Sequence, residues 1–214
     1  MAIAAIAPFD VAFTAATFGS PLLRMALIAS LALIGAFSAD RAGFQLAGHD
    51  VHRSILVGSA AAIVVAIYVI ALDAFMFRSS LPASYVQFIK YTSLQERLAY
   101  FMLRAFNENV IYRLFVFSTA TYAISRIRGV KASELAPALV WGVMIATQLL
   151  NISLNVILQP SAPLTPMALV YDVLRYVAPG VLWAWLFRRY GFMTAEIASV
   201  GCHVFLQPAL GWLI

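Results

Sequence analysis

Charge is scarce in this sequence. Charged residues make up 11% of its 214 residues, whereas a soluble domain carries about 25%. Hydrophobic residues make up 63%, and the mean hydropathy is +0.90. This composition excludes an ordinary soluble globular domain and predicts a multi-pass membrane protein. The net charge of +5 comes from few residues. It is typical of loops on a cytoplasmic membrane surface, so we expect no nucleic-acid partner.

Cysteine is nearly absent as well. Cys202 stands alone, which excludes an intrachain disulfide. The first basic residue is Arg24, so no charged segment precedes the first apolar stretch and we expect no signal peptide. Internal repeats and low-complexity linkers are also missing. We therefore predict one membrane domain over residues 1–214.

Apolar runs predict an all-α fold, a transmembrane bundle of about six spanning helices. A crossing needs about 20 predominantly apolar residues. The predicted spans are residues 22–39, 55–77, 98–124, 135–158, 167–187 and 192–214. Residues 1–18 predict an interfacial or partly inserted helix, and residues 78–97 a short amphipathic helix in the interface. Pro179-Gly180 predicts a kink in the fifth span.

The basic loops orient this bundle. Residues 125–134 and 188–191 are rich in Arg and Lys, which places both loops on the cytoplasmic side. The uncharged, proline-rich loop at 159–166 then lies outside. We expect a bacterial cytoplasmic (inner) membrane protein in contact with lipids.

Polar side chains on three predicted spans lie at similar depth. With a rise of about 1.5 Å per residue, Glu108 lies roughly 22 Å, Gln148 roughly 21 Å and His203 roughly 17 Å from the cytoplasmic ends. A charge at the bilayer centre costs at least about 2.5–3.5 kcal/mol on insertion scales. Three helices that offer polar groups at one depth predict a buried site.

The polar residues within each span share a helical face because they are three or four residues apart. These sets are Arg104 and Glu108; Gln148, Asn151 and Asn155; and Ser199, His203 and Gln207. Ion pairing and interhelical hydrogen bonds explain such sets without any chemistry. Nearer the outer surface, we expect Asp172 and Arg175 to form a local ion pair.

The stretch Glu108-Asn109-Val110-Ile111-Tyr112-Arg113 resembles the first motif, Glu-Glu-x-x-x-Arg, of the CPBP family. This family comprises the CAAX prenyl protease and bacteriocin-processing membrane proteins, also called Abi proteins. Its last motif, His-x-x-x-Asn, follows a Pro-Gly pair, an apolar helix and a basic turn. Here Pro179-Gly180, Arg188-Arg189 and His203-Val204-Phe205-Leu206-Gln207 keep that order. The resemblance covers residues 98–214, the predicted CPBP-like core.

Members of the family are glutamic intramembrane endopeptidases. The resemblance implies that Glu108 is the base that activates water, and that His203 and Gln207 stabilise the oxyanion. The first-motif residues Asn109 and Arg113 belong to the same candidate site. The set on the fourth span supplies candidate substrate contacts, Gln148, Asn151 and Asn155. We expect no cofactor and no metal, because His49 and His52 have no third helix-borne ligand.

Three departures weaken the catalytic half of the motif. Asn109 stands where the family has a second Glu, and the fourth span has no His. Arg104, if paired with Glu108, would favour the ionised carboxylate and weaken it as a base. An endopeptidase acting on a peptide near the membrane therefore remains one hypothesis. A non-catalytic pseudoprotease, serving as scaffold, assembly factor or subunit of a larger membrane complex, is the second.

A small transporter is a third and weaker hypothesis, because inverted repeats are not evident. One structural observation separates the first two hypotheses. It is whether a second base or a His lies within hydrogen-bond reach of Glu108.

Overall fold

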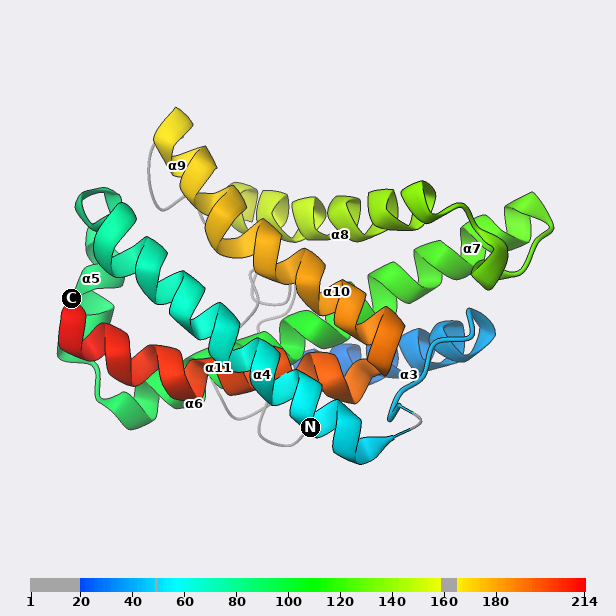
Figure 1. Ribbon diagram of the computed structural model, residues 1–214, viewed down its shortest axis with the longest axis horizontal. Helices are drawn as coiled ribbons and strands as arrows, with labels where there is room; N and C mark the ends of the chain where they lie inside the picture. Colours follow the sequence, from blue (N-terminus) through cyan, green and yellow to red (C-terminus); the bar gives the residue numbers. More distant parts are fainter. Residues whose placement is uncertain (1–19, 49, 159–164) are drawn as a thin grey trace.

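Helices make up every regular element of the part of the chain that the computed structural model describes. These residues are 20–48, 50–158 and 165–214, without the side chains of 155–158. The longer helices are α3 (Pro21–Arg41), α4 (Val51–Ile70), α6 (Leu94–Glu108), α7 (Ser118–Arg128), α8 (Pro137–Leu158), α10 (Ala178–Tyr190) and α11 (Phe192–Leu213). The shorter ones are η1 (Ala71–Met76), η2 (Arg78–Ser80), α5 (Ala83–Tyr91), η3 (Asn109–Phe117), η4 (Ala132–Glu134), α9 (Pro166–Asp172) and η5 (Val173–Val177). The predicted all-α fold class is confirmed (Figure 1).

Four helices are long and apolar enough to cross a membrane. They are Pro21–Arg41, Val51–Met76, Pro137–Leu154 and Pro166–Tyr190. The predicted spans 98–124 and 192–214 are helical but more polar. The count of about six therefore stays a prediction. The segment 1–18 lies outside the described residues.

The predicted amphipathic segment 78–97 contains the short helix α5. A separate helix, α6, follows it. Ser93 begins α6 with a capping box, in which its hydroxyl accepts from the Glu96 N–H while the Glu96 carboxylate accepts from the Ser93 N–H. This reciprocal cap satisfies two donors that a helix start leaves free. The cap therefore marks the point where the chain enters the helix that carries Glu108.

Within the described ranges, three stretches of the longer helices are π-helical. They are η1, η3 and η5, and each continues an α-helix without a break. The segment η5 ends two residues before Pro179, which has no N–H to donate to the preceding turn. The kink predicted at Pro179-Gly180 stays a prediction. Each π segment also carries a buried charged residue, namely Asp73, Arg113 and Arg175. Wider turns of this kind are frequent at functional sites.

Close helix packing surrounds these segments. The last helix, α11, packs along α4 and against α6 and α10, while α3 packs against η3 and α7. In Figure 1, α11 runs beside α4 and α6, on the opposite side of the bundle from α8. Gly35 of α3 lies against the η3 backbone, where an added Cβ would come 2.7 Å from the carbonyl carbon of Leu114. Small residues at such contacts let two helices approach closely.

Replacing Gly35 with Ala is expected to lower the thermal unfolding midpoint, because the new methyl group must push α3 away from η3. The matched control is Gly142→Ala on α8, where a Cβ meets nothing within 4 Å. That change adds helix propensity and should leave the midpoint equal or higher. Unfolding in detergent micelles, followed by circular dichroism, measures both. Equal midpoints for the two variants would contradict the close packing of α3 on η3.

Candidate functional site: a polar cavity inside the bundle

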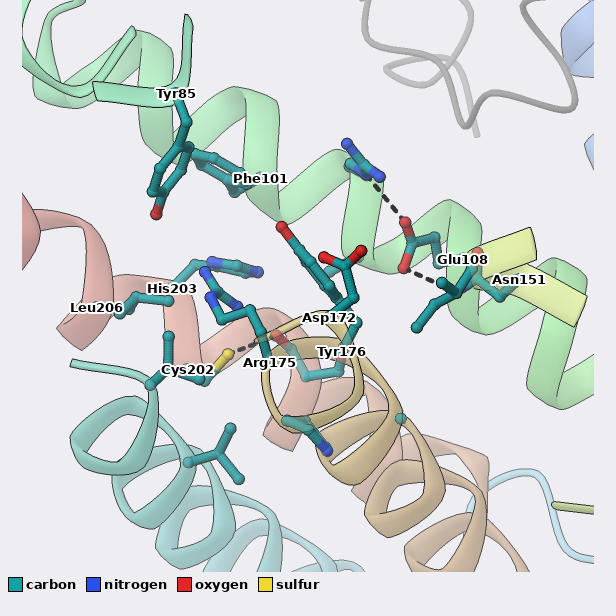
Figure 2. A pocket seen from close by; sticks show the side chains of 18 of the residues that line it. Tyr85, Phe101, Glu108, Asn151, Asp172, Arg175, Tyr176, Cys202, His203 and Leu206 are labelled. Atoms are coloured by element: carbon teal, nitrogen blue, oxygen red, sulfur yellow. Dashed lines mark hydrogen bonds and ion pairs between the residues drawn. The ribbon is translucent and has the colours of Figure 1, made fainter. Parts of the chain in front are cut away.

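A cavity of about 650 Å³ lies between α6, α8, η5 and α11 (Figure 2). Aromatic and apolar side chains form much of its wall. Its polar and charged lining includes Arg104, Glu108, Arg113, Gln148, Asn151, Asp172, Arg175 and His203. The volume is in the range of sites that hold a small molecule or a peptide segment.

Glu108 is the last residue of α6 and projects into this cavity. Its Oε1 accepts from Arg104 Nε at 2.9 Å, which confirms the predicted pairing of the two residues. Its Oε2 accepts from Asn151 Nδ2 at 3.4 Å, a long contact. Among the described residues, neither a His nor a second carboxylate is hydrogen-bonded to Glu108. A guanidinium and an amide thus hold the carboxylate.

Arg113 lies one turn beyond Glu108, in η3, and is only 4% exposed. Its Nη2 donates to Gln148 Oε1 at 2.7 Å, which joins η3 to α8. The carboxylates of Glu108 and Glu196 both lie close enough to attract the guanidinium electrostatically. Glu196, on α11, also lies near Asn109. Arg113 is therefore attracted by two carboxylates, while its Nη2 donates to a neutral amide.

Gly180 makes room for the Gln148 side chain. A Cβ at this position would collide with Cδ and Oε1 of Gln148. We expect Gly180→Ala to displace the Gln148 amide and break its hydrogen bond with Arg113. A charged hydrogen bond contributes about 1.5–3 kcal/mol, so the free energy of unfolding should fall by a similar amount. In a Gln148→Ala background, which already lacks this hydrogen bond and its side chain, Gly180→Ala should cost little more; an equally large further loss there would contradict the steric explanation.

His203 lines the same cavity from α11. Its ring stacks on Phe101, with the ring centroids 5.4 Å apart and the planes 17° apart. Its Nδ1 has no hydrogen-bond partner among the described residues. Gln207 is fully buried but lies outside the cavity lining, and its amide is likewise without a partner there.

The structure thus gathers only part of the predicted site. Around the cavity it brings together Glu108, Arg113, Gln148, Asn151 and His203. Asn109 is fully buried but not part of the lining. The side chain of Asn155 lies outside the described part of the chain.

The structure also holds a second buried network of hydrogen bonds that we did not predict from the sequence. Asp73, fully buried in η1, accepts from Arg175 Nε at 3.0 Å and 3.1 Å through its two oxygens. The hydroxyls of Tyr85 and Tyr171 each donate to the same carboxylate at 3.0 Å. Arg175 thus pairs with Asp73, and the predicted local pair with Asp172 is wrong. Opposite charges near the same end of two predicted spans were the signal that could have found this network.

No family model, curated protein or solved structure matches the chain. The described residues contain no group of three or more His, Cys, Asp or Glu side chains able to hold a metal. Fold and site together define an all-α protein with four candidate membrane-spanning helices, three of which line a cavity together with α6 and α11.

Proposed function

We propose that this chain is a non-catalytic, CPBP-like protein of the bacterial cytoplasmic membrane. Its cavity holds a peptide segment of a membrane-protein partner without cleaving it. The observation that carries this proposal is the environment of Glu108, which is held by Arg104 and Asn151. The Arg104 guanidinium occupies one oxygen of the carboxylate, and the Asn151 amide cannot accept a proton in place of the missing base. The protein would act as a scaffold, an assembly factor or a subunit of a larger membrane complex.

In this proposal the chain crosses the membrane about six times. The polar stretch α6–η3–α7 and the helix α11 supply the two spans beyond the four most apolar helices. Charges within a membrane segment are tolerated when they face the bundle interior and find partners. Arg104 pairs with Glu108, and Arg113 donates to Gln148. Large apolar side chains such as Leu33, Phe75 and Trp212 are exposed and suit contact with lipid tails.

Endopeptidase activity is the second candidate, and one observation favours it. Glu108 and His203 line the same cavity. In that reaction Glu108 would take a proton from water, whose oxygen attacks the peptide carbonyl. His203 would donate a hydrogen bond to the resulting oxyanion.

A peptidase assay separates the two candidates. Wild type, Glu108→Ala and His203→Ala are each reconstituted in lipid and given quenched fluorescent peptides, with the exposed Asp40→Ala as control. We expect all four to show the same background rate, because Glu108 has no second base. Measurable cleavage by wild type and Asp40→Ala that both cavity variants lose would overturn the non-catalytic proposal.

A further inference from the structure

Asp172 is a carboxylate of the cavity without a partner. It is partly buried at the end of α9 and lines the cavity. No hydrogen bond or ion pair reaches it from the described residues. In contrast, Glu108 is paired with Arg104, and the buried Asp73 is paired with Arg175. Asp172 thus presents a carboxylate without a counter-ion to the cavity, and a cationic group that enters from outside the chain would pair with it there.

The other carboxylate of the cavity lining, Glu108, already has a cationic partner. The guanidinium groups of Arg104 and Arg175 each have a carboxylate partner. Arg113 donates to Gln148 and is attracted by Glu108 and Glu196. Of the two carboxylates in the cavity lining, Asp172 is therefore the one that no arginine of the described residues neutralises, so a cation in the cavity would find its counter-ion there.

Aromatic rings line the same cavity as this carboxylate. Tyr176, four residues after Asp172, shares its helical face and also lines the cavity. In Figure 2 both side chains rise from the same helix toward α6, which carries Phe101. Tyr100 and Phe101 meet edge to face at 4.9 Å between centroids, and Phe88 lies 5.2 Å from Tyr100. The faces of such rings attract organic cations.

We propose that the cavity binds an organic ammonium group, with the Asp172 carboxylate as its counter-ion and the aromatic rings of Tyr100, Phe101 and Tyr176 beside it. This inference rests on the proposed binding function and specifies the chemical group that the cavity would recognise. A lysine side chain or a free amino terminus of a partner carries this group. The head group of an ethanolamine lipid carries the same chemistry.

Calorimetric titration in maltoside micelles, which carry no charge and no ammonium group, tests the proposal. The probes are dodecylamine and its neutral analogue dodecanol. Because hydrogen bonds to charged groups are strong, we expect wild type to bind the amine roughly tenfold to a hundredfold more tightly than the alcohol. Asp172→Asn should lose this preference and still bind dodecanol, whereas Asp172→Glu and the exposed control Asp40→Asn should keep it.

Equal affinity of wild type for the two probes, or an unchanged preference in Asp172→Asn, would overturn the proposal. Should Asp172→Asn fail to fold, Tyr176→Leu replaces it, and an unchanged preference in that variant would count against the aromatic contribution in the same way. Competition by phosphatidylethanolamine, but not by phosphatidylglycerol, would identify a lipid as the source of the ammonium group; no competition by either would exclude the ethanolamine lipid. The peptidase assay reports on the proposed function separately, so the two can fail independently.

Discussion

Replacement of Asp73 with Asn is expected to lower the free energy of unfolding by about 3–5 kcal/mol. The carboxylate is fully buried and accepts from Arg175, Tyr85 and Tyr171. Its loss leaves the Arg175 guanidinium, 8% exposed, without a counter-ion. Denaturant titration in micelles, followed by circular dichroism, measures the change.

The double variant Asp73→Asn/Arg175→Met provides the control, because it removes the stranded charge together with its partner. We expect it to recover much of the stability that Asp73→Asn loses, since apolar replacements of a buried pair are often close to neutral. Asp40→Asn, on the exposed surface of α3, should change stability by less than about 0.5 kcal/mol. A loss in Asp73→Asn no greater than in Asp40→Asn would show that the ion pair does not stabilise the fold.

Replacement of Arg113 with Ala is expected to cost about 3 kcal/mol, because a charged hydrogen bond is lost and nearby carboxylates lose a balancing cation. Arg113 binds Gln148 and attracts Glu108 and Glu196. Arg113→Lys should recover only a small part, since lysine lacks the planar fork of donors. The same denaturant titration applies.

Arg128→Ala serves as the matched control for Arg113→Ala, because Arg128 is an exposed arginine at the end of α7. It should remain within about 0.5 kcal/mol of wild type. If Arg113→Lys were as stable as wild type, a simple positive charge would suffice, and the specific bond to Gln148 would lose its importance.

The sequence predicts the helices well because apolar runs and turn residues are local signals. The spacing of four residues places Arg104 and Glu108 on one helical face, and in the structure the two side chains form an ion pair. The depths in the membrane calculated from the helical rise are similar for Glu108, Gln148 and His203, and in the structure all three side chains line one cavity. These successes depend on the helical rise and on the cost of polar groups in a membrane, both of which are properties of single helices.

Contacts between helices were not predictable in the same way. Asp73 and Arg175 are separated by 102 residues, and only the packing of η1 on its neighbours shows that they meet.

The π segments widen the helical turn and rotate the side chains that follow. The amino-acid composition of these segments does not indicate a π-helix. Gln207 lies one turn beyond His203 yet outside the cavity lining. A shift of four residues turns a helix by about 400°, so the two side chains differ by about 40° in direction as well as in depth.

Capture of the cavity's occupant tests the central claim most directly. A photoreactive benzoylphenylalanine is placed at Phe88, which lines the cavity, and at Leu33, an exposed residue of α3 outside it. After illumination in native membranes, mass spectrometry gives the mass of any polypeptide joined to the chain. We expect a full-length polypeptide to be captured at position 88 and none at position 33. Truncated polypeptides at position 88, replaced by full-length ones when Glu108→Ala is added, would contradict it.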